Sequence, residues 1–358
     1  MNAIGPRVDI AALLADPDAI RDGAPTLLRR SDGAGLLYGS AVNLFCGAPG
    51  SGKTWFALQA VVEVAEAGCP VWLLDYESTG LLTTERLRAL GLRPDDAQHV
   101  HYHVVAGPMT VEDRHKLDRA AGEEAPVLIV IDSVAEALAA EGCDENVASE
   151  VGRWFADFVR PLARRGAAVL LLDHVVKNRE GRGGWARGSG HKLAAIDGAA
   201  YGLEVVEPWH RGSSGSGALV ILKDRAGHVG GHGAAAADVH VHVGDAGAQV
   251  RIILDPPAGD PAAPMQAARP AFLTPDDVAE RLAHSGGMWD SLGAAMDALA
   301  LSKAGARTAI SRAIAARRIV EVRQGNRVSY RLPESDRLDL DCQALLAETS
   351  GDEAPMGE

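Results

Sequence analysis

The stretch VNLFCGAPGSGKTWFA, from Val42 to Ala57, decides the fold of this chain. Mostly apolar residues predict a buried strand, a glycine-rich turn follows, and an apolar-faced helix begins at Lys53. This order suits a phosphate-binding loop, because glycines let backbone N–H groups and a helix N-terminus point at one anion, while the lysine adds charge and Thr54 a hydroxyl for Mg²⁺. The alternative is a plain glycine-rich turn. The predicted phosphate-binding residues are Gly47, Ala48, Pro49, Gly50, Ser51, Gly52, Lys53 and Thr54.

From Val42 onward, apolar runs alternate with helical patterns, as in an α/β fold built on a mainly parallel sheet. After residue 199 the runs YGLEVVE, GALVILKD, DVHVHV and VRIIL are joined by glycine-rich turns, so we expect an antiparallel extension of the sheet. The earlier runs are VNLFC (42–46), PVWLLDYE (70–77), HVHYHVV (99–105), PVLIVIDS (126–133) and AAVLLLDH (167–174), and the helical patterns cover 53–67, 80–90, 110–121 and 145–165.

Composition limits the class of protein. The 358 residues are 47% hydrophobic and carry a net charge of −13. No apolar run reaches the length of a membrane span and the N-terminus lacks a signal-peptide core, so we expect a cytoplasmic protein without a membrane partner. An acidic chain would have to bind nucleic acid through local basic patches. Wide spacing of the cysteines favours neither a disulfide framework nor a zinc ribbon; they are Cys46, Cys69, Cys143 and Cys342.

Changes in composition divide the chain into five segments. Residues 1–40 are polar with scattered proline and glycine, 41–256 form the α/β core, and the Pro- and Ala-rich stretch 257–270 is typical of a linker. In 271–333, a helix capped by Thr274, two further helical patterns and a hairpin around Gly325 and Asn326 predict a small winged helix-turn-helix domain. Residues 334–358 form an acidic tail.

Two acidic residues follow apolar runs. Nucleotide hydrolysis needs an acid that holds the metal and a group that orients water. Asp132 closes the run VLIVID, and we expect it to join Thr54 at Mg²⁺. Glu77 closes VWLLDYE, and we expect it to orient the attacking water. Parallel sheets bind ligands at the carboxyl edge, where both acids fall. The alternative for each is an acid that only caps a strand.

The motifs together resemble the RecA-like ATPase core, and within it the hexameric replicative helicases of the DnaB and plasmid RepA kind. The resemblance spans about residues 25–255. It implies that His174 senses the γ-phosphate, and that Lys223 and Arg225 project into the ATP site of a neighbouring subunit as a sensor and an arginine finger. Two solvated cations at a hairpin are the alternative for this pair. The matching pieces are GAPGSGKT (47–54), ESTGLLTTERLRAL (77–90), VLIVIDS (127–133), DHVVK (173–177), RGSGHKLAAIDGA (187–199) and the Lys-x-Arg pair.

Basic residues are concentrated in two places. The loop KNREGRGGWARGSG (177–190) combines cations with glycines, so it can follow a phosphate backbone while Trp185 stacks on a base. The segment from Lys303 to Arg331 contains eight basic residues and one acid, Glu321, so its local net charge is +7. A solvated loop and a protein-docking domain are the alternatives. The expected DNA contacts are Lys177, Arg179, Arg182 and Arg187 in the loop, and Arg312 on the outer face of the third C-terminal helix with Arg323 and Arg327 on the wing.

These patterns predict an ATP-driven DNA helicase of a replication system. It would form a homo-oligomer, expected to be a hexamer, and hydrolyse ATP with Mg²⁺ between subunits. Single-stranded DNA would bind to the core loops and duplex DNA to the winged domain. A DNA-bound regulatory or recombination ATPase that oligomerises and switches on ATP without unwinding stays open. A small-molecule phosphotransferase is disfavoured, because it would leave the Lys-x-Arg pair and the basic loop without a role.

Overall fold

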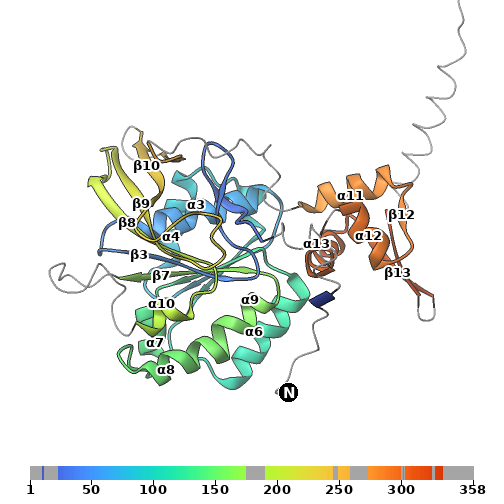
Figure 1. Ribbon diagram of the computed structural model, residues 1–358, viewed down its shortest axis with the longest axis horizontal. Coiled ribbons are helices and arrows are strands. Elements are labelled where there is room, and N and C mark those ends of the chain that lie inside the picture. The colour runs from blue at the N-terminus through green and yellow to red at the C-terminus, as the bar shows by residue number, and fades with distance from the viewer. Residues whose placement is uncertain are drawn as a thin grey trace, which may run out of the picture. The chain divides into compact units, whose positions relative to one another are not determined.

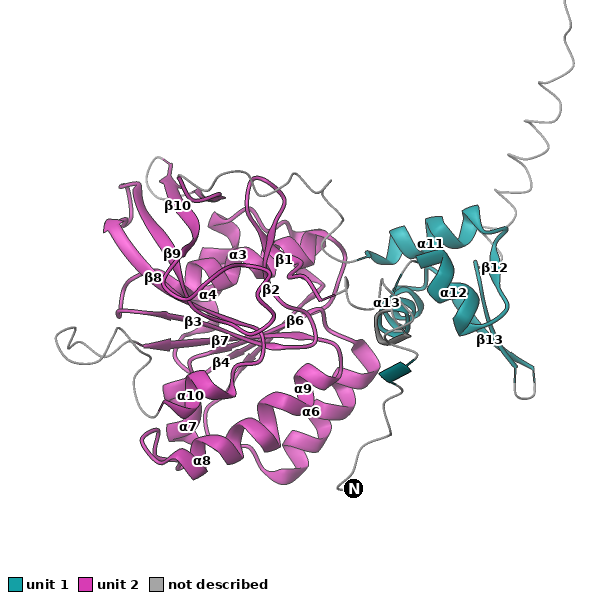
Figure 2. Cartoon of the chain, viewed as in Figure 1, with its two compact units in different colours: residues 1–22, 273–358 teal, residues 23–272 magenta. Residues whose placement is uncertain are grey.

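The computed structural model describes residues 10–11, 23–174, 190–244, 249–258, 273–299, 301, 303–324 and 327–333. Its described residues fall into two compact units (Figure 2). The larger runs from Gly23 to Ala258, and the smaller includes Leu273 to Pro333. Within these described ranges no helix is both long and apolar enough to cross a membrane.

A nine-stranded sheet runs through the larger unit (Figure 1), in the order β11-β10-β9-β8-β3-β7-β6-β4-β5. This confirms the α/β fold with a large, mostly parallel sheet and an antiparallel extension. The parallel strands are β3 (Val42–Gly47), β4 (Val71–Asp75), β5 (Val100–Val104), β6 (Leu128–Asp132), β7 (Ala168–His174) and β8 (Ala199–Glu207). The antiparallel strands are β9 (Gly215–Asp224), β10 (Ala235–Val243) and β11 (Val250–Asp255).

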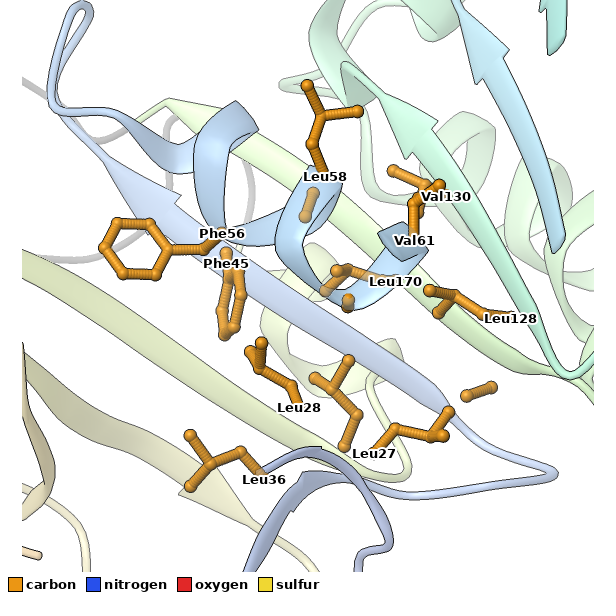
Figure 3. Packing of buried hydrophobic residues seen from close by; sticks show 14 of the residues in the cluster. Leu27, Leu28, Leu36, Phe45, Phe56, Leu58, Val61, Leu128, Val130 and Leu170 are labelled. Carbon is orange, nitrogen blue, oxygen red and sulfur yellow. The ribbon is translucent and has the colours of Figure 1, made fainter. Parts of the chain in front are cut away.

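Helices cover both faces of the sheet, because the apolar runs of the parallel strands must be buried on both sides. On one face, Phe56 and Val61 of the helix after β3 join the same buried cluster as Phe45 and Leu170 of the sheet (Figure 3). The opposite face has a second cluster that includes Phe155. The helices are α3 (Lys53–Glu66), α4 (Gly80–Ala89), α5 (Pro94–Ala97), α6 (Val111–Glu124), α7 (Val134–Ala140), α8 (Ala148–Trp154), η1 (Phe155–Val159, a π-helical turn), α9 (Arg160–Arg164) and α10 (His191–Ala195).

A small hairpin precedes the strand of the phosphate loop. It consists of β1 (Leu27–Arg29) and β2 (Gly35–Leu37), which pair antiparallel. Its four leucines, Leu27, Leu28, Leu36 and Leu37, are buried in the same cluster as Phe45 and Phe56 (Figure 3). Residues before 41, which we expected to be a polar segment, therefore supply part of the hydrophobic core.

Two of the differences between the predicted and the observed elements affect how residues are placed. Strand β4 ends at Asp75, so Glu77 lies in the bend after the strand and does not close it. The helical pattern predicted over 145–165 is α8, η1 and α9, with a π-helical turn in the middle of one continuous run. Because the apolar residues of this run still meet the sheet, the local change of pitch leaves the packing of Trp154, Phe155 and Phe158 intact.

Between Leu273 and Pro333, the described residues of the smaller unit form three helices and a three-stranded antiparallel sheet. Its first helix begins at Thr274, whose hydroxyl accepts a hydrogen bond from the Asp277 N–H (3.1 Å) while the Asp277 carboxylate accepts one from the Thr274 N–H (2.7 Å). Val278, Trp289 and Ile310 belong to its own buried core. The elements are α11 (Pro275–His284), β12 (Met288–Trp289), α12 (Leu292–Leu299), α13 (Lys303–Ala315), β13 (Val320–Gln324) and β14 (Arg327–Arg331), with strand order β12-β14-β13.

Candidate active site

The predicted phosphate loop connects the end of β3 to the start of α3. Gly50 and Gly52 have φ angles of 75° and 92°, the left-handed region that glycine enters without strain. A Cβ at Gly47 would lie 2.5 Å from the Ser51 Oγ, so a side chain there would displace Ser51. Gly52 caps α3 without a side-chain hydrogen bond, which leaves the first N–H groups of the helix available to an anion.

The ammonium of Lys53 is folded back over this loop. Its Nζ donates to the carbonyl oxygens of Gly47 (3.1 Å) and Ala48 (3.3 Å) and lies 3.3 Å from the His174 Nδ1. Burial lowers the pKa of Lys53, while the nearby carboxylates of Asp132 and Glu77 act in the opposite direction. The lysine thus supplies a largely desolvated cation next to the helix N-terminus.

The Oγ of Ser51 is buried and has no hydrogen-bond partner in the described part of the chain. Leaving a buried hydroxyl unpaired costs about 1–3 kcal/mol. A phosphate oxygen bound in the loop would satisfy it, together with the open N–H groups of α3. The residues present therefore fit a nucleotide phosphate, as the loop sequence predicts.

Asp132 and Thr54 meet beside the loop. The Thr54 hydroxyl donates to the Asp132 Oδ2 over 2.9 Å. Burial raises the pKa of Asp132 to about 6, and the charge of Glu77 adds to this rise. A nearby cation stabilises the charged form of a carboxyl group whose pKa is raised in this way. A hydroxyl together with a carboxylate is a ligand set that suits Mg²⁺. Both predicted metal ligands thus lie together and fit the ion.

Glu77 is held by the strand end that precedes it. Asp75, which is buried, accepts hydrogen bonds through Oδ1 from the N–H groups of Glu77 (3.0 Å) and Ser78 (2.7 Å), and through Oδ2 from the Tyr102 hydroxyl (2.9 Å). Asp75 was not among the predicted site residues. An acid two residues before a candidate base, at a strand end, is the local turn signal that points to it.

His174 lies between the two charged groups. Its Nδ1 faces Lys53, and its Nε2 lies 3.2 Å from the Glu77 Oε1. This placement follows from the strand order, because β7 runs between the loop strand β3 and the acid strand β6. The hydroxyl of Ser133 also donates to the Glu77 Oε1. Ser133 was missed in the sequence analysis, although it is the residue directly after Asp132.

Trp209 also lies against the phosphate loop. A Cβ at Gly52 would come within 2.6 Å of the Trp209 ring, and that ring lies 6.1 Å, centroid to centroid, from Phe56. Trp209 follows β8, more than 150 residues after the loop in sequence. No local pattern points to such a contact, because only the sheet topology brings this segment to Gly52.

Arg225 lies at the opposite end of the parallel sheet. The pairing of β8 with β3 and β9 places Asp224, the last residue of β9, level with the start of β3. Arg225 follows it and is exposed, and its N–H donates to the Gly198 carbonyl (3.3 Å). Strand β3 rises roughly 16 Å from its first residue to Gly47. A phosphate in the loop of the same chain is therefore out of reach of the Arg225 side chain.

The contacts of Lys223 differ from what the resemblance implied. Its ammonium does not project outward but donates to the carbonyl oxygens of Leu193 (3.0 Å), Ala194 (3.1 Å) and Ile196 (2.6 Å) at the end of α10. Burial lowers its pKa, and the charge of Arg225 lowers it further. Strand β9 ends at Asp224, so Lys223 belongs to the strand and Arg225 to the turn that follows it.

The structure describes the candidate DNA contacts of the smaller unit but not those of the basic loop. In the smaller unit, Arg312 is buried, with 7% of its surface exposed, which corrects the expected outward position. Helix α13 packs against both α11 and α12, so its covered face is wider than the stripe predicted from its apolar residues. Arg323 and Arg327 are exposed, and the Arg323 Nε donates to a carboxylate oxygen of Glu321 over 2.5 Å. The basic-loop candidates Lys177, Arg179, Arg182 and Arg187 lie outside the described residues.

Comparisons with known proteins bear on the class to which this chain belongs. Residues 12–180 match the model of the AAA domain family. Over 152 residues the chain is 32% identical to the DNA repair protein RadA of Halalkalibacterium halodurans, and the match covers 42% of this chain and 31% of that protein. This chain thus spans about a third of the length of that relative. With the sheet and the phosphate loop, these similarities support a RecA-like P-loop ATPase related to RadA.

Proposed function

We propose that this protein is an ATP-driven DNA translocase, a helicase of a replication system. It would hydrolyse Mg²⁺-bound ATP between copies of the chain, in a ring of the kind formed by the hexameric DnaB and plasmid RepA helicases. The ATPase core is supported by the AAA match and the RadA relative. The unwinding activity, the ring and its number of subunits are the proposal.

The position of Arg225 carries the proposal. It is exposed at the end of the sheet opposite to the phosphate loop of its own chain. An arginine that stabilises the transferred phosphoryl group can contribute about 10³–10⁵ in rate when another subunit supplies it. Because Arg225 cannot reach the loop of its own chain, any action on a nucleotide would be on that of another copy, which is the arrangement that a ring-forming motor requires.

Within one chain, each of the described site residues would have its own role in hydrolysis. Lys53 and the N-terminus of α3 neutralise the phosphates, and Glu77 accepts the proton of the attacking water or orients that water. His174, between Lys53 and Glu77, is placed to contact the γ-phosphate. Mg²⁺, held by Thr54 and Asp132, would neutralise the charge that develops on the phosphate oxygens. Asp75 and Ser133 keep Glu77 in position.

The smaller unit would bind duplex DNA as a winged helix-turn-helix. Its order of a helix, a short strand, two helices and two paired strands is typical of that motif. With Arg312 buried, Arg307 takes its place as the candidate on α13. Arg307 is exposed, and the charges of Arg307 and Arg323 each offset part of the rise that burial causes in the pKa of Tyr330. Single-stranded DNA would bind to the basic loop through Lys177, Arg179, Arg182 and Arg187.

The similarity to RadA favours a second candidate function. A relative that is described as a DNA repair protein is compatible with an ATPase of repair or recombination that oligomerises on DNA and switches on ATP without unwinding it. The same ATP site and the same Arg225 would serve both functions. They differ in whether hydrolysis moves the protein along DNA.

Two measurements on the full chain separate these candidates. ATPase turnover is measured with and without single-stranded DNA, and strand separation is measured on a forked duplex, with Lys53→Ala as the inactive control. The helicase proposal expects DNA-stimulated turnover and ATP-dependent unwinding. Stimulated turnover without unwinding favours the switch. Turnover that does not respond to DNA contradicts both.

The duplex contact has its own test. Replacing both Arg323 and Arg327 by Ala should weaken duplex binding and lower the log–log salt slope by roughly one per lost phosphate contact. Replacing Arg179 and Arg182 should instead weaken single-strand binding and the stimulation of turnover. An unchanged duplex affinity after the first pair of changes makes the smaller unit a protein-docking module.

A further inference from the structure

Helix α10 is held by lysine side chains near both of its ends. Lys192 lies in its first turn, and the ammonium of Lys223 reaches the carbonyls at its C-terminal end. The helix has five residues, too few to be stable alone in water. These side-chain contacts and its packing therefore determine where α10 lies.

The first contact ties α10 to the candidate ATP site. The Lys192 Nζ donates to Asp173 (3.0 Å) and to Glu145 (2.8 Å). The side chains of Lys192 and Asp173 are 1% and 0% exposed. Asp173 also accepts a hydrogen bond from the N–H of His174 (2.8 Å), the residue that contacts Lys53 and Glu77. Separating a buried ion pair would leave an uncompensated charge, so the pair ties α10 to the end of β7.

The second contact ties α10 to the segment that carries Arg225. Lys223 donates to three carbonyl oxygens at the C-terminal end of α10. A cation is favoured at this end by the partial negative charge of the helix terminus. Arg225 lies two residues further on, and its backbone N–H donates to Gly198, just after α10. A displacement of α10 is therefore passed to the backbone at Arg225.

We propose that α10 couples the ATP site of one chain to the position of Arg225 on the same chain, with Lys192 and Lys223 as positioning residues. A change at His174 when its own nucleotide binds or is hydrolysed would thereby alter how Arg225 meets the nucleotide of another copy. This inference rests on the proposed action of Arg225 between copies. Lys223 takes no part in the chemistry and acts through α10.

The test uses two variants of the full chain and their combination. Lys223→Met removes the three donated hydrogen bonds and keeps the length of the stem. Asp173→Asn with Lys192→Met removes the first contact, between α10 and the end of β7, as a neutral pair, which avoids leaving either of these two buried charges alone. Each is expected to lower kcat about tenfold with the KM for ATP within about twofold, because the phosphate loop is untouched.

The combination is decisive. Since both variants act through α10, the combined variant should lose about tenfold, no more than its more affected parent, whereas independent effects would multiply to about a hundredfold. Lys223→Arg keeps a donor for the carbonyls and should restore most of kcat. The control is Lys116→Met, which removes an exposed cation on α6 and should leave kcat unchanged. If Lys223→Met does not fold, Lys223→Gln takes its place.

Arg225→Ala, measured in parallel, keeps the two proposals apart. Normal turnover in Arg225→Ala removes the proposed action between copies, and the coupling with it. If Arg225→Ala is inactive while Lys223→Met turns over at the normal rate, the function stands and the coupling through α10 is wrong. Multiplying losses, or a loss confined to KM, also contradict the coupling.

Discussion

The two ends of the parallel sheet differ in how many of their polar groups have hydrogen-bond partners within the chain. At the end with the phosphate loop, buried Lys53 and Asp132 lie close to half-buried His174 and exposed Glu77, and the hydroxyl of Ser51 has no partner within the described residues. At the other end, Lys223 donates to three carbonyls, and Asp224 accepts from the Tyr38 hydroxyl (2.7 Å) and from three backbone N–H groups.

This difference shows which end is built for a ligand. A buried polar group without a partner is costly, so proteins satisfy such groups internally unless something bound completes them. The end that carries Asp224 is complete by itself and serves to hold Arg225. The end that carries the phosphate loop needs phosphate and a cation. Four changes, two at each end, can break or sharpen this contrast.

Arg225→Ala should have the largest effect. Removing the arginine should lower turnover by about 10³–10⁵ while ATP binding stays near normal, because the phosphate loop is intact. Turnover is measured by phosphate release and binding by nucleotide titration. Subunits with Arg225→Ala and subunits with Lys53→Ala, mixed in one assembly, should recover part of the activity at interfaces that pair the two sound halves. If assemblies that are shown to contain both kinds of subunit recover no activity, Arg225 takes no part in hydrolysis by another copy.

Glu77→Gln should have the second largest effect. The amide cannot accept the proton of water, so turnover should fall by about 10²–10⁴, whereas ATP should still bind. Lys53→Ala provides the contrast, since it should lose binding as well as turnover. The same titration and phosphate-release assays compare the two. Normal turnover in Glu77→Gln assigns the base to another residue.

Gly52→Ala should destabilise the loop by about 1–3 kcal/mol, measured as the free energy of unfolding. Its φ of 92° is unfavourable for alanine, and the new Cβ would lie 2.6 Å from the Trp209 ring. Gly50→Ala is the matched control, because its φ is 75° and no atom lies within 4 Å of the new Cβ. Equal losses for the two changes show that the Trp209 contact is without effect.

Asp224→Asn should have the smallest effect, a loss of about 1–2 kcal/mol in unfolding free energy at neutral pH. Burial alone would raise the pKa of Asp224, but the hydrogen bonds from Tyr38 and the backbone outweigh it and hold the pKa below the ordinary value. The carboxylate therefore stabilises the fold above pH 4, and this contribution is lost as the pH falls through the lowered pKa. Unfolding curves of both proteins should converge in acid. A constant difference down to pH 2 contradicts the assignment.

Much of the candidate site was predictable because its signals are local. The order of strand, glycine turn and helix around Lys53 is written in consecutive residues. Asp132 and His174 end apolar runs, and the carboxyl ends of parallel strands meet at one edge. The burial of Arg312 was not predictable, since the two helices that flank α13 come from separate segments. The burial of Leu27 and Leu36 in the core was not predicted either, because the strands of a short hairpin have too few residues to show a clear hydrophobic period.

The sequence by itself thus determined the α/β class, the candidate phosphate loop and the position of the candidate metal-binding acid, each from residues adjacent in the chain or at strand ends. Only the tertiary structure decided that Trp209 covers Gly52, that Lys223 holds α10, and that Arg225 lies at the end of the sheet away from its own loop. The physical reason is that strand order and register bring these residues to their partners. Side-chain partners across a sheet depend on pairings between distant segments, which no local pattern of hydrophobicity or charge records.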